Sequence, residues 1–331
     1  MSAILDEYPW LQDGWTRLRA YLDAGRIPQA LLMTGPAGSG KHQLAQLLAS
    51  RLLCREPAQF ACGRCHGCRL MEAGTHPDLL RVEPEEPAKP ITVDTIRALT
   101  AALALRPQYS AHRVVILAPA HLMNSNAANS LLKTLEEPER HTVLLLLSER
   151  PSALPATIVS RCQRFRLGLP ERAAVLDFLA ARGHREQAPV LCSMAGGAPL
   201  RALELAGGDR VAARTEFFGD WSGLAEGRQQ PVVVAEKWAK AAVDDLVAWS
   251  ASWLGDLIRL KSAGGGVPLD NSDLLPGLQA LVGRLHLVSL FDHLDRVQQA
   301  RRLLAGQTNR QLLLEDLLIR WAWLARPQTG T

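Results

Sequence analysis

The chain has 331 residues, of which 47% are hydrophobic and 21% are charged. That length exceeds one ordinary hydrophobic core and predicts two or three domains of a globular protein. The formal net charge of +4 neither requires nor excludes contact with nucleic acid. The sequence has no run of eighteen apolar residues and no signal-peptide pattern at its start, so we expect a cytoplasmic protein without a membrane span.

Short apolar runs alternate with helical patterns through the first half of the chain. Continuous apolar runs are typical of strands covered on both faces of a parallel sheet, and their alternation with helices predicts an α/β domain. Expected strands lie, in chain order, at residues 30–34, 78–83, 114–117, 142–148 and 164–167. Expected helices include 41–53, one that begins at the N-cap Thr92, and 125–137.

The second half shows helical patterns only. A helical stretch covers residues 171–205, and the remainder is helical to the end. Six of the eight tryptophans lie in this second half. Within it, apolar side chains recur every three or four residues from Trp238 to Leu257. Such a stripe is usually core, so we expect one helix packed in a bundle. The complete pattern predicts an α/β region followed by an all-α region.

A glycine-rich loop at residues 35–42 lies between an expected strand and an expected helix. Gly35, Gly40 and Lys41 match the G-x-x-x-x-G-K pattern of a loop whose backbone N–H groups hold phosphate. The next residue should carry a hydroxyl for Mg²⁺, but it is His42, and imidazole is a poor ligand for that hard cation. A glycine-rich turn that binds nothing is the alternative interpretation.

The second half of a nucleotide-hydrolysing site should follow the strand at 114–117, with carboxylates that bind Mg²⁺ and position water. The strand is followed instead by Ala118, Pro119, Ala120 and His121. Both missing parts serve the same ion, so we expect neither bound Mg²⁺ nor ATP hydrolysis. Any binding of ATP by the loop, including Gly38, is expected to be weak.

Four of the six cysteines lie within fifteen positions, namely Cys54, Cys62, Cys65 and Cys68. In a large chain without an export signal, such clustering predicts metal binding rather than disulfides. Short C-x-x-C steps place thiolates on tight turns, and four thiolates complete a closed, structural Zn²⁺ site. His66 and His76 are alternative ligands if Cys54 points away, whereas Cys162 and Cys192 are expected to be buried and free of metal.

The motifs occur together in one known family. The glycine-rich loop, the cysteine cluster, Asn129 to Pro138 (NSLLKTLEEP) and Ser160-Arg161-Cys162 follow one another in this order. With these motifs the chain resembles the AAA+ clamp-loader subunits of bacterial DNA polymerase III, gamma/tau and delta prime, over about its first 205 residues.

The resemblance implies three domains. A RecA-like AAA+ parallel-sheet domain is expected at residues 1–168, with an inserted zinc module at 54–68. A small helical lid is expected at 169–207, and a C-terminal helical collar bundle at 208–331.

The resemblance also implies roles for single residues. Gamma/tau keeps an acidic pair and a hydroxyl where this sequence has Ala118, Pro119 and His42. That difference favours the delta-prime branch, a stator in the polymerase holoenzyme that does not hydrolyse ATP itself. In the family Arg161 is presented to the ATP of an adjacent subunit, a task that suits the permanently charged guanidinium. Arg201 falls where related proteins carry a second sensing arginine.

The implied partners are the gamma/tau and delta subunits, in a hetero-oligomer that loads the sliding clamp onto primed DNA. The family places the helix at 125–137 near a subunit boundary, where Lys133 and Glu136 are candidates for contact with a neighbour. By sequence pattern alone, Arg161 and Arg201 are also consistent with ordinary surface charge.

Two other functions stay open. The first is an active ATPase of the gamma/tau type, against which the missing Mg²⁺ ligands argue. The second is a zinc-ribbon DNA-binding protein, for which only Arg64 and Arg69 supply positive charge between Cys62 and Leu70.

Overall fold

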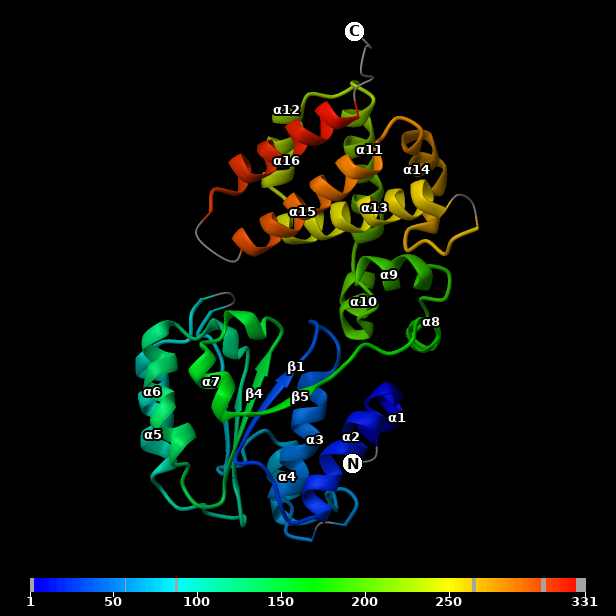
Figure 1. Cartoon of the computed structure of the whole chain (residues 1–331). Helices are drawn as coiled ribbons and strands as arrows, with labels where there is room; N and C mark the ends of the chain where they lie inside the picture. Colours follow the sequence, from blue (N-terminus) through cyan, green and yellow to red (C-terminus); the bar gives the residue numbers. More distant parts are fainter. Residues whose placement is uncertain (1–2, 57, 87–88, 264–265, 305–307, 326–331) are drawn as a thin grey trace. The chain divides into compact units, whose positions relative to one another are not determined.

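The computed structural model describes residues 3–56, 58–86, 89–263, 266–304 and 308–325. The chain divides into two compact units (Figure 1), the first made of Met1–Phe178 with Gly197–Arg201 and the second of Leu179–Gly196 with Ala202–Thr331. Residues of the expected lid belong partly to each unit, and the division into three domains stays a prediction. No helix in the described ranges is both long and apolar enough to cross a membrane.

A five-stranded parallel sheet forms the centre of the first unit, in the order β2-β3-β4-β1-β5. The strands are β1 (Ala30–Thr34), β2 (Leu79–Val82), β3 (Arg113–Leu117), β4 (Thr142–Ser148) and β5 (Gln163–Arg166). All five predicted strands are therefore confirmed, with ends displaced by no more than one residue. Because the strands are parallel, the loops after β1, β3 and β4 all leave from the same edge of the sheet.

Helices cover both faces of this sheet, which explains why the inner strands β1, β3 and β4 are buried along nearly their whole length. The helices of the unit are α1 (Ala3–Glu7), η1 (Pro9–Leu11, 3₁₀), α2 (Gln12–Asp23), α3 (Lys41–Leu53), α4 (His66–Glu72), α5 (Val93–Leu103), η2 (Ala120–Leu122, 3₁₀), α6 (Ser125–Glu136), η3 (Pro151–Ala153, 3₁₀) and α7 (Ala156–Arg161). On β1, Leu31 packs in a core with Leu44 of α3. The next residue, Leu32, packs in the opposite core with Ile96 of α5 and Leu131 of α6.

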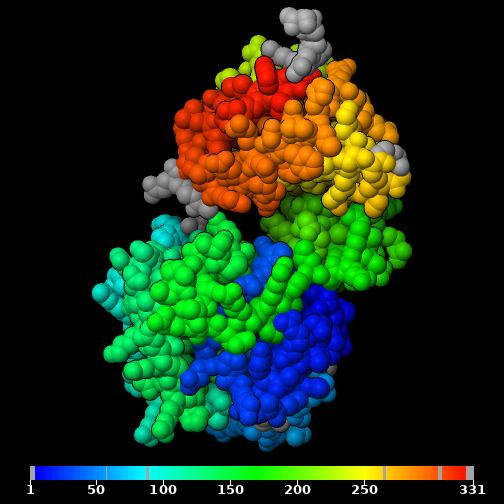
Figure 2. Space-filling view, viewed as in Figure 1, coloured from blue at the N-terminus to red at the C-terminus, as the bar shows by residue number. Residues whose placement is uncertain are grey.

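The helix α2 packs beside the edge strand β5. Arg17 donates a hydrogen bond to the Arg166 carbonyl at 3.1 Å, and its guanidinium carbon lies 4.3 Å from the centre of the Phe165 ring. Figure 2 shows the surface of the N-terminal segment in blue. The N-terminal helices thus close the face of the sheet that α3 covers.

Side-chain caps from Thr92 and Asn124 fix the starts of α5 and α6. Thr92 Oγ1 accepts a hydrogen bond from the Thr95 amide at 3.4 Å, which confirms the predicted N-cap. Asn124 Oδ1 accepts one from the Ala127 amide at 2.8 Å and begins α6. The helix α6 ends at Glu136, one residue before the predicted end.

Helices make up the second unit, which confirms the predicted all-α region. In chain order the elements are α8 (Arg172–Ala180), α9 (Ala188–Met194), α10 (Pro199–Ala206), α11 (Arg210–Ala225), α12 (Pro231–Ala239), α13 (Val243–Ala263), η4 (Ser272–Leu274, 3₁₀), α14 (Leu275–Val282), α15 (Leu287–Leu303) and α16 (Arg310–Leu324). Of these, α8 and α10 have residues in both units.

The tryptophan stripe is core, but the prediction of one helix for it is wrong. The helical conformation is interrupted between α12 and α13. The Ala242 carbonyl then accepts hydrogen bonds from the amides of Asp245 and Leu246 as α13 begins. The spacing of four residues from Trp238 to Ala242 to Leu246 survives the break, so periodicity alone does not show it. Trp238, with 1% of its surface exposed, and Trp253, with 0%, are buried inside the unit.

Candidate functional site

The glycine-rich loop runs from the end of β1 to the start of α3, where Gly40 is the N-cap residue with φ of 99°. A Cβ on Gly38 would lie 2.4 Å from the Arg201 nitrogen, and one on Gly40 would lie 2.8 Å from a methyl group of Leu11. Both residues have positive φ, so glycine is required by conformation as well as by space. The loop therefore has the form of a phosphate-binding loop, held closely by its surroundings.

Lys41 is turned back onto its own loop. Its side chain is 5% exposed, its Nζ donates a hydrogen bond to the Pro36 carbonyl at 2.7 Å, and it forms an ion pair with Glu149 at 3.9 Å. Burial lowers the pKa of Lys41, and the charge of Glu149 partly opposes that effect. The amine that would bind phosphate is thus already paired within the chain.

Glu149 is a residue that the sequence analysis missed. It directly follows β4, and the parallel sheet brings it to the edge where the phosphate loop lies. The signal available in the sequence was its place directly after a buried apolar strand. Beside it, Ser148 Oγ and His121 Nδ1 are 3.3 Å apart. This edge therefore carries polar groups, although β3 itself supplies no carboxylate.

His42, Ala118 and Pro119 occupy the positions at which a nucleotide-hydrolysing site normally supplies oxygen ligands for Mg²⁺. His42 occupies the first turn of α3, directly after Lys41. At the end of β3, Ala118 and Ala120 are buried, and with Pro119 they offer no side-chain oxygen. A Mg²⁺ ion bound here would lack both of the protein oxygen ligands that the site normally provides.

Two neighbouring segments close over the phosphate loop. Trp10 Nε1 donates to the Ser39 carbonyl at 2.9 Å, and the Leu200 amide donates to the Gly38 carbonyl at 3.0 Å. The structure thus brings the backbone of Arg201, at the start of α10, against the loop. A sensing role for the Arg201 side chain stays a prediction.

Arg161 is the last residue of α7, and its guanidinium contacts the neighbouring helix α6. Its Nε donates to Glu136 Oε1 at 2.7 Å, its Nη2 pairs with the same oxygen, and its Nη1 donates to the Thr157 carbonyl at 3.0 Å. The side chain is 34% exposed and that of Glu136 is 49% exposed. The structure therefore connects two residues that the sequence analysis treated separately.

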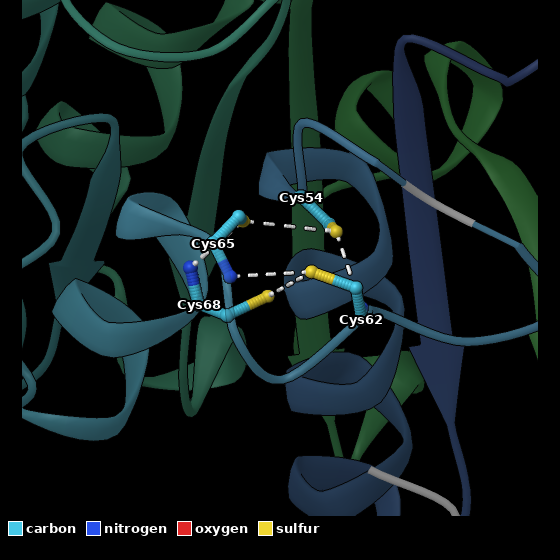
Figure 3. Close-up of side chains that lie close together, drawn as sticks. All are labelled: Cys54, Cys62, Cys65 and Cys68. Atoms are coloured by element: carbon cyan, nitrogen blue, oxygen red, sulfur yellow. Dashed lines mark hydrogen bonds between the residues drawn. The ribbon is translucent and has the colours of Figure 1, made fainter.

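The four clustered cysteines come together in one site (Figure 3). Their sulfur atoms point toward one another and all lie within 4.8 Å of one another, with 4.0 Å between Cys54 and Cys65 and 3.9 Å between Cys62 and Cys68. A tetrahedral zinc ion with Zn–S bonds of about 2.3 Å requires sulfur–sulfur edges of about 3.8 Å. The cluster therefore fits a four-coordinate metal ion.

Backbone geometry supports this set of ligands. The Cys62 amide donates to Cys54 Sγ at 3.2 Å and the Cys65 amide donates to Cys62 Sγ at 3.3 Å. Burial tends to raise the pKa of Cys65, but backbone N–H donors, including that of Cys68, lower it to about 6. The amides thus favour the thiolate of Cys65, the form of cysteine that binds metal, whereas burial raises the pKa of Cys54 and Cys68.

The alternative histidine ligands are not part of the cluster. His76 Nδ1 accepts a hydrogen bond from the Asp78 amide at 3.1 Å, and its Nε2 lies 3.4 Å from Ser110 Oγ. Across the described residues, the group that could hold a metal consists of the four thiols, without His66. Cys162 and Cys192 are buried, as predicted.

A phosphate loop on a five-stranded parallel sheet, followed by an all-helical region, defines an AAA+-type protein in which no hydroxyl directly follows the loop lysine and no carboxylate directly follows β3. Two sequence families match the chain: "DNA polymerase III, delta subunit" at residues 11–170 and "DNA polymerase III, delta subunit, C terminal" at residues 208–322.

Named relatives match nearly the whole chain. DNA polymerase III subunit delta' of Pseudomonas aeruginosa is 39% identical over 97% of this chain and 99% of that protein. The subunit delta' of Escherichia coli is 34% identical over 95% of this chain and 94% of that protein. The chain therefore belongs to the DNA polymerase III delta-prime subunit family.

Other similarities are more partial or more distant. The tau subunit of Escherichia coli is 37% identical over 46% of this chain and 23% of that protein. A solved gamma subunit-related protein of Thermotoga maritima is 18% identical, with a TM-score of 0.40, over 90% of this chain and 94% of that one.

Proposed function

We propose that the chain acts as the non-hydrolysing subunit of a DNA polymerase III clamp loader in the cytoplasm. In this role it assembles with gamma/tau and delta subunits, and the assembly loads the sliding clamp onto primed DNA. Membership in the delta-prime family supports the role. The observation that carries the non-hydrolysing character is the absence of a hydroxyl at His42 and of carboxylates at Ala118 and Pro119.

Arg161 is the residue that we propose acts on ATP, in trans. It would complete the site of the adjacent gamma/tau subunit by placing its charge on the phosphates. Three observations support this assignment: Arg161 ends a helix, it is partly exposed, and its guanidinium keeps N–H groups that bond to none of the described residues. Lys41, in contrast, is paired with Pro36 and Glu149.

A structural Zn²⁺ ion is proposed for the four-cysteine site. The S₄ ligand set suits zinc, which favours tetrahedral thiolate coordination. With all four positions taken by protein sulfur, the ion would have no open position for substrate, so its contribution is to the stability of the segment at 54–68. Cys54, directly after α3, and Cys65 and Cys68, at the start of α4, would join these two helices through the ion.

The test is to reconstitute the clamp loader with Arg161→Ala or Lys41→Ala and to measure clamp-stimulated ATPase and clamp loading. An arginine finger contributes on the order of 10³–10⁵ in rate at the site it serves. We expect Arg161→Ala to lower total ATPase by a fraction, because one site among several faces this chain, and to lower loading further. Lys41→Ala should leave both nearly intact.

Gel filtration of each complex controls for assembly. If the Arg161→Ala complex loads clamps as fast as the parent, the proposed role in trans is wrong. The isolated chain provides the second arm, since it should not hydrolyse ATP, and His42→Thr alone should not create activity. Mg²⁺-dependent hydrolysis by the isolated chain that disappears in Lys41→Ala would instead favour an active ATPase of the gamma/tau type.

A further inference from the structure

The contact between Arg161 and Glu136 joins the ends of two helices. Arg161 ends α7, Glu136 ends α6, and the two residues lie 25 positions apart in the sequence. Two nitrogens of the guanidinium, Nε and Nη2, engage the same carboxylate oxygen, and Nη1 engages the Thr157 carbonyl one turn earlier in α7. The arginine is thus held from two sides by its own chain.

The geometry of the guanidinium determines which N–H donors of Arg161 these contacts leave unbonded. The group has five N–H donors in one rigid plane, of which Nε carries one and each Nη carries two. Nε and Nη2 lie along one side of the plane, and this side faces Glu136. Among the described residues, Nε and Nη1 each donate one hydrogen bond and Nη2 forms the ion pair with one N–H, so two of the five donors are left, one on Nη1 and one on Nη2. Such a pair can bind a phosphate oxygen.

From this arrangement we propose that Glu136 is a positioning residue for Arg161. Glu136 and the Thr157 carbonyl orient the guanidinium so that its two remaining N–H groups stay available to the phosphates of the adjacent subunit. The inference rests on the proposed role of Arg161 in trans and deepens it. It also gives Glu136 a role within the chain, where the sequence analysis considered it a candidate for contact with a neighbour.

The exposure of the Glu136–Arg161 ion pair indicates that Glu136 orients the guanidinium and does not block it. Glu136 is 49% exposed and Arg161 is 34% exposed, so water screens the attraction and the pair is weak. A triphosphate carries several negative charges and can compete for the guanidinium without first breaking a strong bond. Loss of Glu136 therefore removes an orienting contact and does not release a blocked group.

The experiment uses the reconstituted clamp loader with Glu136→Ala, Glu136→Gln, Glu137→Ala or Arg161→Ala. Glu137 is the matched control, because it is the next residue, is exposed, and forms no ion pair within the described part of the chain. We expect Glu136→Ala to slow clamp loading roughly fivefold, equal to about 1 kcal/mol. The loss should lie in the turnover number and leave the KM for ATP unchanged.

The remaining variants separate positioning from general effects of charge. Glu136→Gln keeps an acceptor oxygen and should lose less than Glu136→Ala, and Glu137→Ala should match the parent. In the Arg161→Ala background, Glu136→Ala should cause no further loss, because its effect passes through the arginine. A purely structural role for Glu136 would give equal losses in both backgrounds.

Each outcome bears on one of the two proposals. If Arg161→Ala slows loading while Glu136→Ala does not, positioning by Glu136 is refuted and the role of Arg161 stands. Faster loading by Glu136→Ala would mean that the carboxylate restrains the arginine, which also contradicts positioning. If Arg161→Ala loads normally, the proposed role of Arg161 in trans fails, and positioning by Glu136 fails with it.

Discussion

Single residues at the carboxyl edge of the sheet are the basis for the proposal that this chain does not hydrolyse ATP. Lys41 is still present, but its amine bonds to Pro36 and pairs with Glu149. His42 and Pro119 stand where metal ligands would be needed. A lysine by itself cannot bind Mg²⁺, so the retained part of the motif cannot compensate for the missing part.

Asp78 shows how one buried carboxylate organises a loop. It is fully buried, and it accepts hydrogen bonds from the amides of Gln108, Tyr109 and Ser110 at 2.7, 2.8 and 2.9 Å. It also pairs with Arg113 at 3.6 Å. Burial by itself raises the pKa of Asp78, but the three amide donors outweigh it and hold the pKa below its ordinary value.

We predict that Asp78→Asn lowers the free energy of unfolding by about 2 kcal/mol at pH 7, because buried donors lose a charged acceptor. A pKa that is lower in the folded state gives stability above the unfolded value of about 4, and that stability is lost as the pH falls through the folded pKa. The difference between the variant and the parent should therefore shrink below about pH 4. Urea unfolding across this pH range measures it.

The control for this prediction is Asp94→Asn, which removes an exposed carboxylate paired with Arg97. That change should cost little at any pH, since exposed pairs contribute about 0–1 kcal/mol. An Asp78→Asn penalty that is equal at pH 7 and pH 3 would show that the ionised carboxylate is not what stabilises the loop.

At the scale of elements, the cysteine-bearing segment at 54–68, the proposed zinc module, lies between α3 and β2 and has a small core of its own. Cys54 directly follows α3, Cys65 is the N-cap of α4, and the four cysteines pack together with Ala61. A Cβ on Gly67 would lie 2.8 Å from the Leu53 carbonyl, so α4 approaches the end of α3 closely. So small a core is typical of modules that a metal ion stabilises.

We predict one Zn²⁺ per chain in protein purified without chelator, and its loss in Cys65→Ser. The matched control is Cys192→Ser, which alters a buried cysteine outside the cluster and should keep the metal. Elemental analysis of the two variants and the parent decides the question. Metal-free parent protein, or full zinc content in Cys65→Ser, would exclude this site.

On the scale of the whole molecule, the chain forms two compact units with separate cores. The first has the two cores on either side of the sheet. The second is built on buried tryptophans, such as Trp221 and Trp321, whose rings stack with centres 3.9 Å apart. Units with their own cores are expected to respond separately to a local change.

Removal of the metal should therefore destabilise the first unit alone. Six of the eight tryptophans belong to the second unit, so fluorescence reports mainly on that unit, whereas far-UV circular dichroism reports on both. We predict that chelation or Cys65→Ser lowers a melting transition seen by dichroism and leaves the fluorescence transition in place.

The converse variant is Asp256→Asn in the second unit. Asp256 is fully buried and accepts hydrogen bonds from the amides of Asp270 and Asn271 at 3.1 and 2.7 Å. This change should lower the fluorescence transition and keep the zinc content. If chelation shifts both signals together, the two units unfold as one and the prediction is wrong.

Local patterns in the sequence were sufficient for most elements and for the cysteine site. Apolar runs placed the inner strands β1, β3 and β4 within one residue, because burial on both faces of a sheet leaves a continuous apolar signature. The spacing of Cys62, Cys65 and Cys68 predicted a metal site because ligands this close in sequence must lie close in space. The missing Mg²⁺ ligands at His42 and Pro119 were also readable, since each belongs to a fixed position of a motif.

Tertiary structure decided the partners of the charged groups. Glu149 meets Lys41, and Glu136 meets Arg161, only because parallel strands and adjacent helices bring distant residues to one edge. The sequence did not reveal the break after Trp238 either, because the periodicity continues across it. Burial periodicity records which side of an element faces the core, but it carries no information about which side chain on another element lies opposite.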